Sequence, residues 1–111
     1  MFIDNLSDLQ ADIQDHLVKS FLDIIVLSML KQSPSHGYAI IADIHKQFDV
    51  LLSPGTLYPL LYSLEKKELI TIEQDGRRKN YILTEKGSAQ ADRVINIYGS
   101  QINHLLRFIG A

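Results

Sequence analysis

Residues 53–67, Ser-Pro-Gly-Thr-Leu-Tyr-Pro-Leu-Leu-Tyr-Ser-Leu-Glu-Lys-Lys, decide the fold prediction for this chain. Ser53 is a favoured residue just before a helix, and Pro54 is a favoured first helical residue. Leucines then recur at the spacing of one helix face, at Leu57, Leu60, Leu61 and Leu64. The pattern predicts a helix with a buried leucine face and a polar outer face. Pro59 lacks a backbone donor and is expected to distort the start of this helix.

A second amphipathic helix is predicted just before this one, over residues 37–48. Its apolar stripe consists of Ile40, Ile41, Ile44 and Phe48. Two helices joined by a short turn are typical of a helix-turn-helix, in which the second helix enters the major groove of DNA. The major groove, about 12 Å wide, admits one helix.

A β-hairpin is predicted after the two helices, with strands at residues 69–74 and 79–83. If Ile70 and Ile72 share the core with Tyr81 and Leu83, residue 72 pairs with 81 and residue 70 with 83. Gly76 and Arg77 are then the central turn residues, and a glycine in the first of these positions suits a type II′ turn. The cations Arg77, Arg78 and Lys79 would lie at the tip of this wing, within reach of DNA phosphates.

A long helix is predicted from Thr84, which can cap it, to Ile109. Such a helix has a length of roughly 37 Å. Its apolar residues step by three and four positions, at Ala91, Val94, Tyr98, Ile102, Leu105 and Ile109. Because the helix is too long for this small core to cover, the stripe predicts a homodimer. The alternative is that the stripe folds back on the chain's own core.

The N-terminal part is predicted to contain a short helix over residues 5–15 and a buried helix over residues 18–32. Met1–Asp4 lack the basic and apolar regions of a signal peptide, and Phe21–Leu30 is too short to cross a membrane. The chain has no cysteine, which excludes a disulfide framework and fits a cytoplasmic protein. We therefore expect no contact with a membrane.

Catalytic and metal-binding motifs are not found in the sequence. The four histidines are scattered, and neither a nucleophile elbow nor a glycine-rich phosphate loop occurs. These observations predict a protein that is not an enzyme and has no metal or cofactor. The net charge is −2, but residues 1–50, with three Lys and seven Asp, carry −4, whereas residues 51–87 carry +1. A local basic point on an acidic body is compatible with phosphate contacts.

Five blocks of sequence, in this order, resemble those of one family. They are His36-Gly37-Tyr38-Ala39-Ile40, Pro54-Gly55-Thr56-Leu57-Tyr58-Pro59-Leu60-Leu61, Leu64-Glu65-Lys66-Lys67, Arg77-Arg78-Lys79-Asn80-Tyr81 and Thr84-Glu85-Lys86-Gly87. Over residues 17–109 the chain resembles the short-tailed branch of the PadR family of transcriptional regulators. The resemblance implies a winged-helix repressor, or occasionally an activator, that dimerises through its C-terminal helix. It also implies an aromatic small-molecule effector between the subunits in some members; with no Trp in the chain, Tyr98 is the nearest candidate contact.

Together these features predict a mainly α (α+β) fold: a winged helix-turn-helix with a two-stranded wing. Residues 1–83 would form the DNA-binding domain with its N-terminal helical extension, and residues 84–111 the dimerisation helix. The expected function is repression by a homodimer on a pseudo-palindromic, double-stranded operator. The expected DNA-binding residues are His36, Tyr38, Thr56, Tyr58, Tyr62, Ser63, Lys66, Lys67, Arg77, Arg78 and Lys79.

Other interpretations of these residues are open at the level of sequence. Tyr58 and Tyr62 also suit half-buried positions, His36 also suits closing the turn before its helix, and the wing cations also suit a solvated turn. The acidic first half keeps a second function class open, a winged helix that docks a protein and does not bind DNA. A third alternative is a small-molecule sensor with its site at the dimer interface.

Overall fold

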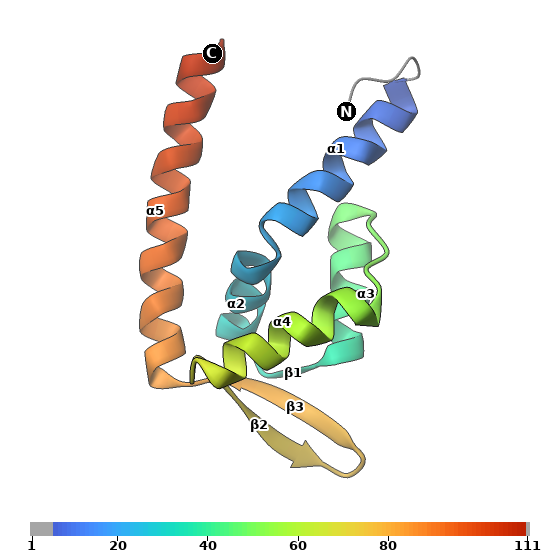
Figure 1. Ribbon diagram of the computed structural model, residues 1–111, viewed down its shortest axis with the longest axis vertical. Coiled ribbons are helices and arrows are strands. Elements are labelled where there is room, and N and C mark those ends of the chain that lie inside the picture. Colours follow the sequence, from blue (N-terminus) through green and yellow to red (C-terminus); the bar gives the residue numbers. More distant parts are fainter. Residues whose placement is uncertain (1–5, 111) are drawn as a thin grey trace.

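The computed structural model describes residues 6–110. The predictions that concern Met1–Asp4 and a helix start at residue 5 lie outside the described residues. The elements are α1 (Leu6–Ser20), α2 (Leu22–Gln32), β1 (Ser35–His36), α3 (Gly37–Phe48), α4 (Pro54–Lys66), β2 (Ile70–Asp75), β3 (Arg78–Leu83) and α5 (Glu85–Ile109). Figure 1 shows α1 and α5 rising from one end of the winged domain, with the β2–β3 wing projecting from the other. This order confirms the predicted winged helix-turn-helix with a long C-terminal helix.

The core lies between α2, α3 and α4. Val26 of α2, Ile40 of α3 and Leu57 of α4 are fully buried, and the remaining core residues surround them. On α4, Leu57, Leu61 and Leu64 are buried and Leu60 is partly buried against the core, which confirms the predicted leucine face. The helix runs without interruption through Pro59, so the expected irregularity does not divide it.

The N-terminal helices divide at Phe21, whereas the predicted helices divide at residues 16 and 17. Residues 18–20 belong to α1, and Phe21, with φ −111° and ψ 20°, separates α1 from α2. The Phe21 ring lies edge-on to the Tyr98 ring of α5, with 5.7 Å between ring centres. Beyond this bend α1 extends away from the core, as Figure 1 shows. The expectation that residues 18–32 form one helix is therefore wrong, because the aromatic contact with α5 lies at the bend.

The wing has the predicted register. Ile72 pairs with Tyr81 and Ile70 with Leu83, so that Asp75 and Arg78 flank the turn. Gly76 has a φ of +61°, whereas Arg77 does not have a positive φ, in agreement with the type II′ turn. The sheet also contains a strand that was not predicted: β1 pairs with β3, placing Ser35 opposite Tyr81 and His36 opposite Asn80. Two residues are too few to carry a strand periodicity, so the sequence pattern could not indicate β1.

The end of α4 leads directly into the wing. Glu68 has a φ of +62°, the Leu69 amide donates to the Leu64 carbonyl at 3.0 Å, and the Glu68 amide donates to the Glu65 carbonyl at 2.9 Å. This is a Schellman motif with Glu in the left-handed position that glycine usually occupies. Thr84 then caps α5 as predicted, since its hydroxyl oxygen accepts from the Gly87 amide at 2.9 Å. The same hydroxyl reaches the Glu68 carbonyl at 2.7 Å, which ties α5 to the end of α4.

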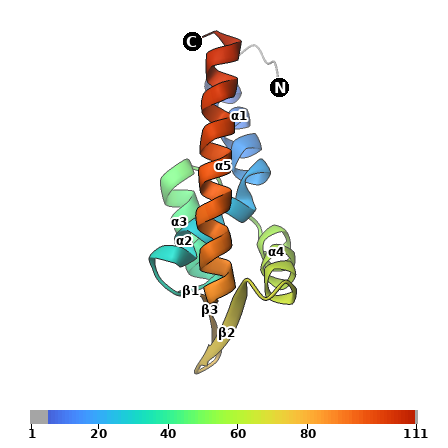
Figure 2. The ribbon, with the colours of Figure 1, turned by 90° about the vertical axis from the view of Figure 1, so that its left-hand side faces the viewer.

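The first part of α5 packs against α2, where an ion pair joins Lys31 to Asp92. Figure 2 shows the rest of α5 continuing straight beyond the winged domain. Large apolar side chains are exposed on this part, among them Ile102, Leu105 and Ile109. No helix within residues 6–110 has the length and apolar character needed to cross a membrane.

Candidate nucleic-acid interface

The outer face of α4 carries the side chains predicted to read DNA. Thr56 and Tyr62 are exposed, and Tyr58 and Ser63 are partly buried. The Thr56 hydroxyl lies 3.0 Å from that of Ser53, which occupies the predicted cap position but makes no side-chain bond to a helix amide. Tyr62 is 60% exposed, and the Lys66 ammonium lies 5.4 Å from the centre of its ring. This cation–π contact holds a phenol and a positive charge together on the solvent face of the helix.

Tyr58 lies over Gly37, and this contact joins the two helices of the helix-turn-helix. A Cβ atom added at Gly37 would lie 2.3 Å from the Tyr58 hydroxyl oxygen and 2.6 Å from its Cζ atom. Only glycine therefore leaves room for the Tyr58 side chain in this position. Burial raises the pKa of Tyr58, and the nearby Tyr38 raises it further. The phenol consequently stays protonated and able to donate a hydrogen bond.

Tyr38 lies beside Tyr58 at the start of α3. The two rings meet edge to face, with 6.3 Å between their centres, and Tyr38 is 71% exposed. The Tyr38 side chain is therefore open to a partner outside the chain.

The wing tip carries three exposed cations, Arg77, Arg78 and Lys79. Within residues 6–110 none of the three takes part in an ion pair. The Gln74 side chain donates a hydrogen bond to the Gly76 carbonyl at 3.1 Å, and this bond stabilises the turn. The three charges are thus presented to solvent on a braced hairpin.

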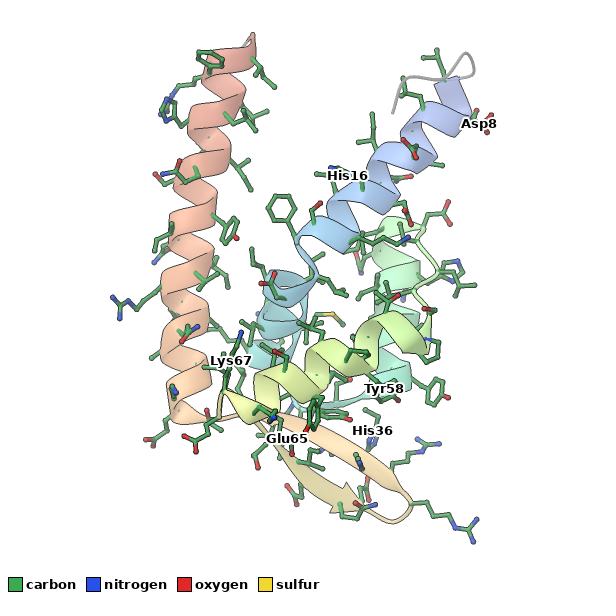
Figure 3. The ribbon with its side chains drawn as sticks, viewed as in Figure 1. Asp8, His16, His36, Tyr58, Glu65 and Lys67 are labelled. Carbon is green, nitrogen blue, oxygen red and sulfur yellow. The ribbon has the colours of Figure 1, made fainter. Side chains whose placement is uncertain are left out.

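A hollow of about 600 Å³ lies between the wing and the helix-turn-helix. In Figure 3 the labelled His36 and Tyr58 lie between α4 and the wing, whereas Lys67 lies at the other end of α4, near α5. The hollow thus brings six residues of the predicted DNA-binding set, which lie far apart in the chain, to one surface. Its lining consists of His36, Gly37, Tyr38, Ala39, Tyr58, Arg77, Arg78, Lys79 and Tyr81.

The lysines at the end of α4 lie apart from this hollow. Lys66 is exposed beside Tyr62, and Lys67 is the C-terminal cap of the helix. The Lys67 carbonyl accepts a hydrogen bond from the Lys86 ammonium at 3.0 Å, but its own side chain is exposed. Cations at a helix C-terminus are also favoured by the helix dipole, so their position alone does not require DNA.

The predicted dimerisation stripe is exposed over most of its length. Ala91 is buried in the chain's own core and Val94 is partly buried, so the exposed part begins at Tyr98. Tyr98, the candidate ligand contact, already has one edge against Phe21. Three further apolar side chains, which the stripe did not include, are exposed on α5: Ile97, Leu106 and Phe108. No group of three metal-ligating side chains occurs among the residues that the structure describes.

Known proteins resemble this chain in both sequence and fold. The model of the PadR-like family of transcriptional regulators matches residues 26–93. The transcriptional regulator YqjI of Escherichia coli is 40% identical over 70 residues, which are 60% of this chain and 34% of that protein. The chain therefore spans about a third of the length of this relative.

Two solved structures place the fold in the same group. A PadR family transcription regulator from Clostridium difficile has a TM-score of 0.74 at 25% identity, covering 81% of this chain and 99% of that one. A winged-helix DNA-binding protein from STIV has a TM-score of 0.61 at 26% identity, covering 73% of this chain and 88% of that one. The family model covers the helix-turn-helix, the wing and the start of α5, and the chain belongs to the PadR-like family of transcriptional regulators.

Proposed function

We propose that this protein is a sequence-specific repressor that binds a pseudo-palindromic, double-stranded operator as a homodimer in the cytoplasm. The observation that carries the proposal is the hollow that brings Tyr38, Tyr58 and the three wing cations to one surface. The Tyr38 phenol beside unpaired cations suits the phosphate backbone, and the outer face of α4, which carries Tyr58, suits the major groove.

The proposed contacts divide into two kinds. Thr56, Tyr58, Tyr62 and Ser63 of α4 read base edges in the major groove. Phosphates are bound by side chains around that helix, namely His36, Tyr38, Lys66, Lys67, Arg77, Arg78 and Lys79. Of the cations, only Lys66 lies in α4 and Lys67 caps it, so much of the affinity comes from the wing.

A second copy of the chain provides the remaining affinity. α5 is 25 residues long, and Tyr98, Ile102, Leu105 and Ile109 expose an apolar stripe beyond the winged domain. Burying this stripe against a second α5 would remove the apolar surface from water and place two α4 helices on one DNA duplex. Such a two-fold arrangement requires an operator with two related half-sites.

The proposal is tested by an electrophoretic mobility shift with the DNA upstream of the chain's own gene, in excess unrelated competitor DNA. The expected result is a shifted complex that contains two protein chains and resists the competitor. In the Tyr62→Ala variant the preference over competitor should fall, because Tyr62 is exposed and its loss leaves the core intact. If neither this DNA nor a random-sequence pool is shifted at low salt, the winged helix has another partner, and the alternative of a protein-docking module is supported.

A further inference from the structure

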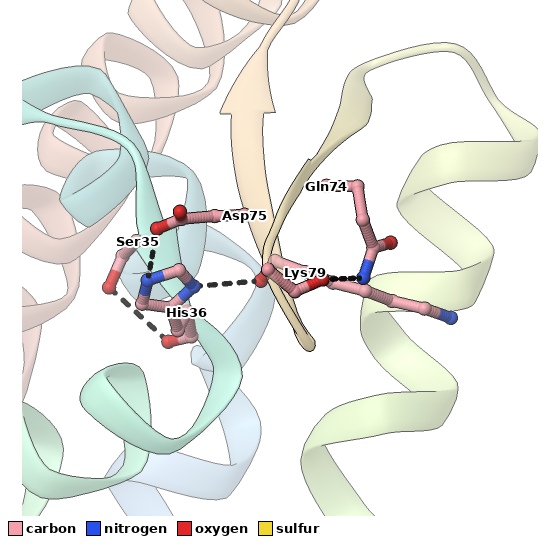
Figure 4. Close-up of polar contacts among 6 residues, drawn as sticks. Ser35, His36, Gln74, Asp75 and Lys79 are labelled. Atoms are coloured by element: carbon pink, nitrogen blue, oxygen red, sulfur yellow. Dashed lines mark hydrogen bonds and ion pairs between the residues drawn. The ribbon is translucent and has the colours of Figure 1, made fainter.

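The His36 ring bridges the start of α3 to both strands of the wing. Its Nδ1 atom lies 3.1 Å from the Lys79 carbonyl oxygen on β3, and its Nε2 atom lies 3.6 Å from a carboxylate oxygen of Asp75 on β2. Figure 4 shows the ring between these two partners. In the sequence, His36 directly precedes Gly37, and the Tyr58 side chain of α4 lies over Gly37. One short segment therefore contacts both the recognition helix and the wing.

The contact with the carbonyl determines which nitrogen carries the proton. A carbonyl oxygen only accepts, so Nδ1 must be the protonated nitrogen of the neutral ring. In this tautomer Nε2 presents a lone pair to the negative carboxylate of Asp75, an arrangement that gives no attraction. A second proton turns Nε2 into a donor and turns the same contact into an ion pair. Histidine is the side chain that gains such a proton between pH 8 and pH 5.

Charged groups of both signs surround the ring. β2 contributes the carboxylates of Asp75 and Glu73, and Glu73 lies opposite Asn80 and thus in the same row as His36. The turn and β3 contribute the cations Arg77, Arg78 and Lys79, which line the same hollow. The phenols of Tyr38, Tyr58 and Tyr81 line it as well. The Asp75 carboxylate is the acid in ion-pair distance of the ring.

We propose that His36 is a positioning residue for the wing, and that its protonation strengthens the hold of α3 on β2 and β3, so that DNA binding tightens as the pH falls. This inference rests on the proposed DNA-binding function. Beside its own proposed phosphate contact, His36 would act through Arg77 and Arg78, by limiting the positions of the hairpin that carries them. A hairpin already held in its DNA-binding position loses less freedom on binding.

The first test needs no DNA. In two-dimensional NMR of the ¹⁵N-labelled protein, the amide signals of Arg77, Arg78 and Lys79 should move between pH 8 and pH 5.5 along the same curve as the His36 ring signals. In Asp75→Asn this coupled movement should largely disappear. Wing amides that are insensitive to the His36 titration would overturn the proposal, whether or not the protein binds DNA.

The second test measures the dissociation constant for the operator duplex at pH 6 and pH 8, at constant salt. The variants are His36→Asn, whose amide can keep the bond to the Lys79 carbonyl but cannot titrate, and Asp75→Asn. The control is His45→Gln, which removes a similar pair, since His45 Nε2 on α3 lies 3.9 Å from a carboxylate oxygen of Asp49, the C-terminal cap of that helix. Removing one acid also raises affinity at every pH, so the quantity compared is the ratio of the two constants.

The pH 8 to pH 6 ratio should be roughly two- to fivefold larger in the wild type than in His36→Asn or Asp75→Asn, as for an exposed ion pair. His45→Gln should keep the wild-type ratio. Equal ratios in the wild type and His36→Asn would overturn the inference while leaving DNA binding established. If the wild type binds no DNA at either pH, the proposed function fails, and the NMR measurement alone decides the role of His36.

Discussion

Replacing Gly37 with alanine should separate DNA binding from folding stability. The new Cβ atom would lie 2.3 Å from the Tyr58 hydroxyl oxygen, whereas ordinary contact begins at 3.4 Å. The hydroxyl must therefore retreat by about 1 Å, which is permitted because the crowded atoms are the end of a partly exposed side chain. The ring is expected to swing away from Gly37 and from Tyr38, with which it now packs edge to face.

Two small terms of opposite sign set the stability of this variant. Alanine in the first turn of α3 gains up to about 1 kcal/mol over glycine, and the displaced Tyr58 ring loses a similar amount of packing. The free energy of unfolding should thus stay within about 1 kcal/mol of the wild type. In DNA binding, a lost hydroxyl contact costs about 1–1.5 kcal/mol, or roughly tenfold in affinity for each half-site.

The assay combines urea unfolding, followed by circular dichroism, with fluorescence anisotropy of a labelled operator duplex. A double-mutant cycle with Tyr58→Phe supplies the control, because both changes remove the same hydroxyl contact. Gly37→Ala should weaken binding in the wild-type background and have little further effect in the Tyr58→Phe background. If Gly37→Ala binds within twofold of the wild type, or if the affinity losses of the two changes are fully additive, the reasoning that Gly37 leaves room for the Tyr58 side chain in its DNA-binding position is refuted.

Three further predictions concern the scaffold. Gly87→Ala should lower the free energy of unfolding by about 3 kcal/mol or more, because its Cβ would lie 1.8 Å from the rigid Leu69 carbonyl oxygen. Gly99→Ala on the same helix has open space and should raise the free energy of unfolding by up to about 1 kcal/mol. Equal urea midpoints for the two variants would contradict this contrast. Leu105→Glu should yield a folded monomer in sedimentation velocity, because the side chain is 54% exposed and contributes nothing to the core; a persisting dimer would mean that another surface joins the chains. Burial raises the pKa of Tyr81, so the stability that its neutral phenol contributes is complete below about pH 10 and is lost as the pH rises above that value. Tyr81→Phe should therefore flatten the decline of the urea midpoint between pH 9 and pH 11. An unchanged decline would count against this assignment.

Patterns local in the sequence predicted much of this fold. The leucine spacing of residues 57–64 placed the buried face of α4, and the alternation of Ile70, Ile72, Tyr81 and Leu83 gave the register of the wing. Both succeed because one face of each element must be buried, so that a shift of one residue would expose the core side chains.

The features that sequence patterns missed all depend on contacts between distant residues. The bend at Phe21 lies at a contact with Tyr98. The strand β1 forms because His36 pairs with Asn80 of β3, which is far away in the sequence. The seat of Tyr58 on Gly37 belongs to the same class. The available signal was Gly37 itself, because glycine is the residue that permits another group to approach the backbone closely.

The dependence of operator affinity on salt tests the central claim most directly. In the Arg77→Ala/Arg78→Ala variant, the slope of log affinity against log salt should become shallower by about 2 per protomer, or about 4 for a dimer, and binding should weaken on all sequences alike. The control Arg93→Ala/Arg107→Ala removes the same charge from exposed positions on α5 and should leave the slope unchanged. A wing variant with the slope of the wild type would contradict the assignment of the wing to DNA phosphates.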